Sequence, residues 1–281
     1  MTNWDLSSTF IVPDWPAPPN VKALQTTRLG GVSAAPYDSL NLGDHVNDLS
    51  LNVAKNRQLL NAFVPSEPVW LKQVHGVRAI DAALSSCLES ADASFTQQKN
   101  VVCVTMTADC LPVLLCNQAG TVVAAVHAGW RSLCDGVIEA TLVSMQAANP
   151  QLQSAQLMAW LGPAIGPTAF EVGSEVRAQF IAQDPDAALA FVPKGDKWLG
   201  NLYQIASQRL NRLGITAIYG AGLSGSMQSD TSQSNKSHLD GEQSQLVEVQ
   251  PWCTYSDTER FFSFRRDGDT GRMATLIWLS D

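Results

Sequence analysis

The sequence has little positive charge, no long apolar run and no closely spaced pair of cysteines. It contains 18 Lys and Arg residues against 26 Asp and Glu residues, so its formal net charge is −8 over 281 residues. Nonspecific binding to nucleic acids or to anionic membranes depends on a positive field that this composition does not provide. We therefore expect neither kind of partner, although a local group of arginines could hold one small anion.

No segment approaches the roughly 20 consecutive apolar residues that a membrane-spanning helix needs. The first residues also lack the basic start and the apolar middle of a signal peptide, because Asp5, Pro13, Asp14 and Pro16 interrupt them. We expect a cytoplasmic protein.

Cysteine is sparse and widely spaced. The six cysteines, at positions 87, 103, 110, 116, 134 and 253, are too few for a disulfide scaffold. None forms a Cys-x-x-Cys pair, which excludes zinc ribbons and thioredoxin-type redox motifs. Each is expected to be a buried reduced thiol, and Cys110 alone stands in a setting that indicates chemistry.

The patterning predicts a mixed α/β fold around one large core, since 45% of the residues are hydrophobic. Hairpins mixed with strand–helix units favour a mixed-sheet, layered α/β sandwich, with residues 1–281 in a single domain. Short apolar segments predict strands over 10–12, 21–25, 69–74, 101–106, 111–116, 121–126, 157–161, 215–219 and 273–279. Apolar residues at helical spacing predict helices over 53–63, 132–148, 174–182 and 201–213.

One polar stretch interrupts this pattern near the C-terminus. Residues 224–250 contain seven serines and five glutamines with very little apolar material. A loop of this length is unusual inside a compact domain. We interpret it as a mobile surface insert within the single domain.

Three residues with metal-ligand side chains stand where predicted strands end. His75 follows the segment 70–74, Cys110 comes shortly after the strand 101–106, and His127 follows the segment 122–126. If these strands are neighbours, two imidazoles and one thiolate could bind a borderline-soft ion such as Zn²⁺ and leave a fourth position open for water, as in catalytic zinc sites. The spacing matches no short metal motif, so two hydrogen-bonded core histidines and a buried cysteine are the alternative.

The other two histidines have simpler explanations. His45 lies in a polar loop, which indicates a surface or local hydrogen-bonding role. His238 lies in the polar insert and is expected to be solvated.

Some charged residues near predicted element ends are candidates for the same site. Arg131 stands at the start of the helix 132–148, where free backbone N–H groups favour an anion. Arg265, Arg266 and Arg272 cluster before the last predicted strand; they could bind phosphate, or they could pair with the acidic residues around them. Asp109, next to Cys110, is a candidate for the outer-shell acceptor that orients a ligand imidazole.

At these residues the sequence resembles the YfiH family, also called laccase-domain or multicopper polyphenol oxidase-like proteins. Residues 90–94 resemble the family's Ala-Asp-Ala stretch, whereas the insert 224–250 is longer and more polar than the family pattern. The other matching segments run in order along nearly the whole chain: Thr27–Ser33, Ser39–Gly43, Leu71–Gly76, Thr107–Val113, His127–Arg131, Gly162–Gly166, Phe170–Gly173, Cys253–Tyr255 and Phe262–Arg272.

The resemblance implies one α/β domain with a catalytic zinc on His75, Cys110 and His127. It further implies phosphorolysis of purine nucleosides (adenosine, inosine, guanosine and methylthioadenosine), with phosphate as the second substrate, together with adenosine deamination. The candidates for binding substrate or phosphate are Arg28, Asn41, Arg57, Arg131 and Arg265.

Other functions fit the same residues. A set of two histidines and one cysteine also binds copper, with Met106 as the candidate for a weak axial ligand, so a copper-dependent polyphenol oxidase is one alternative. Cys110 and His127 could instead be the nucleophile and base of a Cys-His hydrolase, in line with the link between bacterial family members and the editing of cell-wall precursors. In a non-enzymatic binding module the zinc would be structural and would have a fourth protein ligand.

Overall fold

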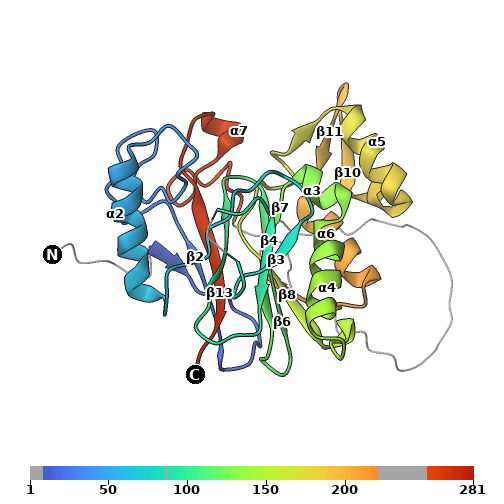
Figure 1. Cartoon of the computed structure of the whole chain (residues 1–281). Helices are drawn as coiled ribbons and strands as arrows, with labels where there is room; N and C mark the ends of the chain where they lie inside the picture. The colour runs from blue at the N-terminus through green and yellow to red at the C-terminus, as the bar shows by residue number, and fades with distance from the viewer. Residues whose placement is uncertain (1–8, 86–87, 221–251) are drawn as a thin grey trace.

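Two sheets form the centre of the fold, and strands from both ends of the chain contribute to one of them. The computed structural model describes residues 9–85, 88–220 and 252–281 (Figure 1). The predictions for Cys87, for His238 and for the insert 224–250 lie outside these residues.

The strands are β1 Phe10–Ile11, β2 Val21–Thr26, β3 Ala79–Asp81, β4 Ala93–Thr96, β5 Cys103–Thr107, β6 Leu111–Asn117, β7 Val123–Ala128, β8 Leu157–Leu161, β9 Glu171–Val172, β10 Phe191–Lys194, β11 Lys197–Gly200, β12 Ala217–Gly220 and β13 Met273–Leu279. The helices are α2 Ser50–Leu60, α3 Trp130–Asp135, α4 Val137–Ala148, α5 Ser174–Gln183, α6 Leu202–Arg212 and α7 Phe264–Asp267, with short 3₁₀ turns η1 Asn61–Phe63, η2 Ser154–Gln156 and η3 Pro185–Ala190. None of these described helices combines the length and the apolarity that crossing a membrane requires.

The larger sheet has six strands in the order β12-β8-β6-β7-β4-β3. The strand β6 pairs antiparallel with both β7 and β8, whereas β12 and β3 pair parallel with their neighbours β8 and β4. Every residue of β6, β7 and β8 is buried. Burial on both faces explains why these segments are nearly continuous apolar runs in the sequence.

The smaller central sheet has the order β1-β2-β13-β5 and is antiparallel throughout. The strand β13, which is fully buried, lies between β2 and β5. This sheet therefore joins the N-terminal part of the described chain to its C-terminal part.

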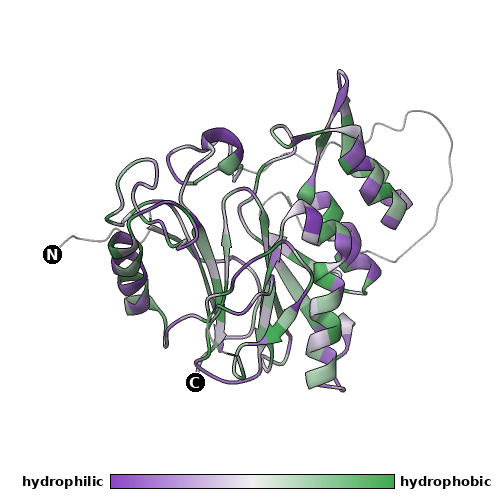
Figure 2. Ribbon diagram, turned by 45° about the horizontal axis from the view of Figure 1, so that its top comes forward, coloured by the Kyte–Doolittle hydropathy of each residue, from purple (hydrophilic) through white to green (hydrophobic). Residues whose placement is uncertain are grey.

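The two sheets pack face to face, and helices cover their outer faces (Figure 1). Side chains that alternate along the strands, such as Leu114, Ala125 and Ile277, fill the space between the sheets. On the other face of the larger sheet, the same strands pack against α4 and α6; on the other face of the smaller sheet, Leu60 of α2 packs with Leu276. Figure 2 shows the result as mainly green central strands and an α2 that has both purple and green segments. The predicted mixed, layered α/β architecture is confirmed.

Some predicted elements have different bounds. The strands β8 and β13 coincide with their predicted ranges, but the predicted strand 69–74 makes only isolated bridges, from Val69 to Cys103 and from Lys72 to Ser90. The single helix expected over 132–148 is two helices, α3 and α4. Gly136 separates them because it adopts a left-handed conformation with φ +94°, which ends a helix.

The sequence patterns do not indicate β3, β4 or the small sheet β10-β11-β9. The strand β4 is short and reads Ala-Ser-Phe-Thr, without an apolar run, although all four residues are buried. Its neighbour β7 sets its position through the register from Ala93 opposite Val126 to Thr96 opposite Val123. Tertiary pairing therefore decides the conformation here, and local propensity does not.

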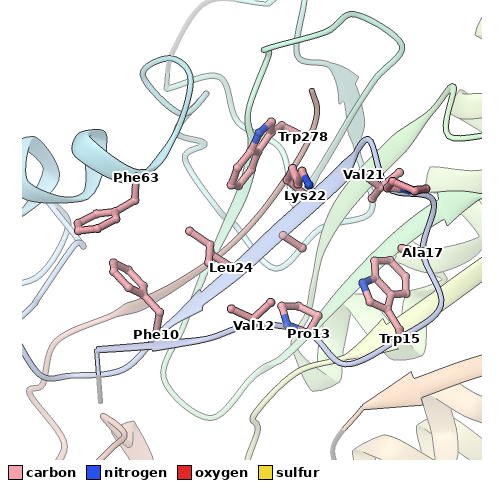
Figure 3. A pocket seen from close by; sticks show the side chains of 12 residues that line it. Phe10, Val12, Pro13, Trp15, Ala17, Val21, Lys22, Leu24, Phe63 and Trp278 are labelled. Carbon is pink, nitrogen blue, oxygen red and sulfur yellow. The ribbon is translucent and has the colours of Figure 1, made fainter. Parts of the chain in front are cut away.

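A cavity of about 540 Å³ lies beside β1 and β2 (Figure 3). Its walls are mainly aromatic and aliphatic, and they include Trp15, Leu24, Phe63 and Trp278; Lys22 is the one charged residue among the described residues that line it. None of the residues predicted to bind metal or substrate lines this cavity.

Candidate metal centre

The side chains of His75, Cys110 and His127 meet at one point. His75 lies in the loop after the bridge at Lys72, Cys110 lies in the turn between β5 and β6, and His127 is near the end of β7. One ligand atom from each residue lies within 4.8 Å of the others. The Sγ atom of Cys110 is 3.8 Å from Nε2 of His75, and the two imidazole centroids are 4.8 Å apart. Within the described residues this is the one such group of His, Cys, Asp and Glu side chains.

The backbone around the cluster explains how the three side chains converge. Because side chains alternate along a strand, His127 continues the row of Val123 and Ala125 that faces the smaller sheet. His75 and Asp109 adopt φ angles of +58° and +93°, a region that residues other than glycine rarely occupy. Such strained conformations gather at functional sites, and here they turn the chain sharply at His75 itself and directly before Cys110.

Asp92 fixes the orientation of both histidines. Its Oδ1 atom accepts a hydrogen bond from Nδ1 of His127 at 2.8 Å and from the backbone N–H of His75 at 2.9 Å. Its Oδ2 atom accepts from the backbone N–H groups of Val74 and Gly76. Because Nδ1 of His127 donates to this buried carboxylate, Nε2 is the ring nitrogen left to bind a metal, which takes the place of the Nε2 proton.

Gly129 leaves room for the cluster. A Cβ atom at this position would lie 2.8 Å from Cδ2 of His75 and 3.0 Å from Sγ of Cys110. Real Cβ atoms do not approach other side-chain atoms so closely, so any other residue would displace a ligand. Gly129 is therefore required, because the side chains of His75 and Cys110 lie too close to it to leave room for a Cβ atom.

The electrostatics of the cluster favour a thiolate. Burial alone would raise the pKa of Cys110, but the charges and hydrogen bonds of His127 and His75 outweigh it and lower this pKa to about 6. Burial likewise opposes the charged form of His127, but Cys110 and Asp92 raise the His127 pKa to about 9. A thiolate is the form of cysteine that binds metals, so the ligand is already in the reactive form at neutral pH.

The donor set fits a metal ion. Two imidazole nitrogens and one thiolate are typical ligands of zinc and of copper, and the outer-shell carboxylate of Asp92 matches the arrangement found behind ligand histidines. His127 is buried, Cys110 is half-buried and His75 is exposed, so the centre is open to solvent on the side of His75. The structure thus contains a metal-binding arrangement of the His-Cys-His type.

The centre forms part of the wall of a cavity of about 430 Å³, a size typical of small-molecule sites. Trp130, Phe170 and Phe264 supply aromatic surface, and Arg131, Arg265 and Arg272 supply positive charge. These residues come from α3, from the segment before β9 and from α7 with the chain that follows it. Figure 1 shows α3 and α7 at the same end of the two sheets.

The structure places two of the five predicted substrate-binding residues, Arg131 and Arg265, in the cavity wall. Arg28 and Arg57 do not line it. Arg28 donates to the backbone carbonyls of Asp38 and Thr258, and Arg57 donates to the carbonyl of Leu42.

Asn41 also lies outside the cavity wall. Its side chain accepts hydrogen bonds from the backbone N–H groups of Gly43 and Arg272 and donates to Asp48. Asn41 thus holds the loops around the cavity in place.

The outer-shell role expected for Asp109 is wrong, because Asp92 orients the imidazole instead. The Oδ1 atom of Asp109 accepts a hydrogen bond from the hydroxyl of Thr254 at 2.7 Å, and its Oδ2 atom accepts from the backbone N–H of Arg265 at 2.6 Å. Asp109 therefore ties the C-terminal part of the chain to the turn that carries Cys110. Neither of these hydrogen bonds involves a ligand histidine.

Sequence reasoning underestimated two further cavity residues, Arg272 and His45. Of the C-terminal arginine cluster, Arg266 is paired internally with Asp267, as one alternative expected, whereas Arg272 lines the cavity. His45 lines it as well, although its polar loop indicated a surface or local role. The signal that could have found both is the motif Asn41–Gly43, because Asn41 accepts a hydrogen bond from the backbone N–H of Arg272 and Gly43 leaves space beside Arg272 and His45.

Known proteins match this chain over nearly its full length. A family model described as multi-copper polyphenol oxidoreductase laccase matches residues 22–280. The relative named purine nucleoside phosphorylase YfiH, from Escherichia coli K12, is 49% identical over 275 residues, which are 97% of this chain and 99% of that protein. The relative named purine nucleoside phosphorylase PA4543, from Pseudomonas aeruginosa, is 45% identical over 276 residues, which are 98% of this chain and 100% of that protein.

Solved structures show the same fold. A Neisseria meningitidis protein, NMB0706, has a TM-score of 0.81 at 41% identity and aligns with 97% of this chain and 100% of its own. YlmD from Geobacillus stearothermophilus has a TM-score of 0.78 at 25% identity, with 95% and 94% covered. These matches show that the chain belongs to the YfiH family, the group whose family model is described as multi-copper polyphenol oxidoreductase laccase.

Proposed function

We propose that this protein is a zinc-dependent purine nucleoside phosphorylase, with His75, Cys110 and His127 as the metal ligands and catalytic residues. The observation that carries the proposal is the composition of one cavity: an open three-ligand centre, aromatic surface and guanidinium groups share the same walls. A reaction between a nucleoside and phosphate needs a surface for a planar base, a positive region for an anion and, in a zinc enzyme, an open position on the metal.

The charge of the cavity supports an anionic co-substrate. Arg131, Arg265 and Arg272 line it, and none of them forms an ion pair with a carboxylate of the described residues. Among the described lining residues, the single carboxylate is that of Asp109, and its oxygens accept hydrogen bonds from Thr254 and from a backbone N–H. The cavity therefore carries positive charge that its own residues do not neutralise, in a protein whose net charge is −8.

Phosphorolysis needs positioning more than covalent catalysis. A phosphate oxygen forms a bond to the anomeric carbon of the ribose, the bond from that carbon to the purine nitrogen breaks, and its electron pair leaves with the base, which takes up a proton. Guanidinium groups hold the phosphate in line with the breaking bond, and the aromatic walls hold the purine and exclude water. A zinc ion on the three ligands supplies Lewis acidity.

The names of the relatives support this reaction class, because two proteins that match 97–98% of the chain are called purine nucleoside phosphorylases. We further propose adenosine, inosine, guanosine and methylthioadenosine as nucleoside substrates, and hydrolytic deamination of adenosine as a second activity at the same site. Deamination exchanges the 6-amino group for oxygen from water and releases ammonia, so it needs no phosphate.

The decisive experiment is anaerobic incubation of the purified protein with adenosine and phosphate. The proposal expects ribose 1-phosphate in an amount equal to the free purine bases released, adenine and any hypoxanthine formed by way of inosine, and it expects inosine in a parallel reaction without phosphate. The variant His75→Ala should lose zinc and phosphorolysis together, whereas Lys72→Ala, an exposed neighbour outside the cavity, should keep both. Phosphorolysis that persists in the zinc-free variant would refute the proposal.

Specific observations also support two other functions, and each of them predicts a different experimental result. The family description and the presence of Met106 in the cavity wall favour a copper-dependent polyphenol oxidase; such an enzyme would carry copper after purification without added metal and would need oxygen for turnover. The thiolate at Cys110 next to His127 favours a Cys-His hydrolase; its activity would survive removal of metal by a chelator.

A further inference from the structure

The ion pairs of the protein single out the arginines of the cavity. Of the eleven arginines in the sequence, all within the described residues, seven pair with a carboxylate there. The four others are Arg131, Arg177, Arg265 and Arg272. Three of these four line the cavity, and Arg177 packs instead on Trp198, which is not a lining residue. The unpaired guanidinium groups are thus concentrated at the candidate active site.

Arg272 differs from the other two arginines of the cavity. Arg131 is exposed and packs on its neighbour Trp130, and Arg265 is exposed and donates to the carbonyl of Glu171. Arg272 is half-buried. Its Nη1 donates to the carbonyls of Thr270 and Gly271, which leaves Nε and Nη2 without an acceptor among the described residues.

The loop 41–45 is built around Arg272. The side chain of Asn41 accepts a hydrogen bond from the backbone N–H of Arg272 at 2.9 Å, and the carbonyl of Arg272 accepts one from the backbone N–H of Leu42 at 3.1 Å. A Cβ atom on Gly43 would lie 2.7 Å from Cγ of Arg272 and 3.3 Å from Cε1 of His45. Because Gly43 has no side chain, the aliphatic part of the Arg272 side chain and the imidazole of His45 can both lie close to it.

From this geometry we propose that Arg272 and His45 form the phosphate subsite of the cavity. The inference rests on the proposed function, since phosphate is the co-substrate of phosphorolysis. Nε and Nη2 of Arg272 present two N–H donors in the fixed geometry that suits two oxygens of one phosphate, and a ring N–H of His45 supplies a third. The aromatic wall at Trp130 and Phe170 is then left for the purine.

The electrostatic environment agrees with this assignment. Burial lowers the pKa of Arg272, although the charges of Cys110, Asp109 and Asp269 oppose the effect. Burial and the charge of Arg272 also lower the pKa of His45, against the opposing influence of Asp44. A bound oxyanion would return to Arg272 the favourable interactions that burial removes.

This assignment gives a different role to Arg57 and Asn41, which the sequence indicates as residues that bind substrate or phosphate. Arg57 holds the same loop, because it donates to the carbonyl of Leu42 and pairs with Asp44. Asn41 binds the backbone on both sides of the subsite. Both are positioning residues that act through Arg272 and His45.

The test compares Arg272→Met with Arg177→Met, which removes an equally unpaired arginine outside the cavity. At saturating adenosine, Arg272→Met should raise the KM for phosphate about 10- to 100-fold, the range for loss of charge-assisted hydrogen bonds, while the KM for adenosine and the zinc content stay near wild type. Arg272→Lys should recover part of the phosphate affinity. Arg177→Met should change none of these values.

A binding measurement separates this inference from the proposed function. Inorganic phosphate should raise the melting temperature of the zinc-loaded wild type and of Arg177→Met, but not of Arg272→Met, and His45→Ala should show a smaller shift than wild type. This readout needs no turnover, so it stands even if the wild type releases no adenine. Unchanged phosphate KM and unchanged phosphate protection in Arg272→Met would overturn the assignment, as would a larger effect of Arg131→Met or Arg265→Met.

Discussion

The carboxylate of Asp92 lies 2.8 Å from Nδ1 of His127, and both side chains are buried, with 0% and 4% of their surface exposed. The same carboxylate also accepts hydrogen bonds from three backbone N–H groups of the loop that contains His75. One acidic side chain therefore positions two ligands that are distant in the sequence.

Replacing Asp92 by asparagine should weaken zinc binding about 10- to 100-fold, the usual effect of removing an outer-shell carboxylate. The neutral amide no longer supports the Nδ1–H of His127, and its NH₂ group cannot accept the hydrogen bonds from the His75 loop. Competition with a chromogenic chelator measures the affinity. Asp81→Asn is the matched control, because Asp81 accepts a turn N–H from Ala83 and does not line the cavity. Equal zinc affinity in both variants would contradict the role given to Asp92.

The variant Gly129→Ala should reduce zinc affinity at least about tenfold, because ligand geometry tolerates only about 0.5 Å of displacement. The added Cβ would press on Cδ2 of His75 and Sγ of Cys110. As a control, Gly195→Ala meets no atom within 4 Å; its positive φ costs about 1–2 kcal/mol of stability without changing zinc affinity. Zinc titration and thermal melting of both variants check this, and a zinc affinity of Gly129→Ala equal to wild type would disprove the steric argument.

In the metal-free protein, alkylation of Cys110 by iodoacetamide should rise with pH around a midpoint near 6. Burial would raise the pKa of this thiol, but His127 and His75 lower it to about 6. Cys103 and Cys116 should remain unlabelled, because burial raises the pKa of each to about 12. The variant His127→Ala should move the midpoint toward that of an ordinary thiol, about 8.5, and a wild-type midpoint already at that value would contradict the prediction.

The same groups link stability to pH when no metal is bound. The folded pKa of Cys110 is depressed, so the stabilising contribution of its thiolate is lost as the pH falls through about 6. The folded pKa of His127 is raised, so its contribution is lost as the pH rises through about 9. The pair therefore stabilises the metal-free fold between these two values, and thermal melting across this range measures the effect.

The sequence identifies the parts of the fold and the site that depend on local pattern. The strand β8 is a continuous apolar run and β13 is nearly so, and both have the predicted bounds. The same reasoning places His127 at the end of a buried strand, which the structure confirms as β7. These features follow from period and composition, which are properties of neighbouring residues.

Other features depend on contacts between distant segments, and the sequence does not show them. Asp92 lies in the segment 90–94 that resembles a family motif, but the sequence indicates no role for it, because the strand β4 that follows it has no apolar run; only the pairing of β4 with β7 brings it to His127. Arg28 and Arg57 resemble ligand-binding residues, but the structure uses their guanidinium groups to bind loop carbonyls. An arginine that binds a carbonyl and one that faces a cavity look alike until the chain is folded.

The position of β13 between β2 and β5 sets an order of events during synthesis. A ribosome makes His75, Cys110 and His127, together with all the strands of the larger sheet, before it makes Arg272 and β13. Until β13 emerges, β2 and β5 have open edges, which attract other strands and favour aggregation. A nascent chain thus has all its metal ligands while the wall that contains Arg272 is still missing, and its vulnerable period lasts until the final strand closes the smaller sheet.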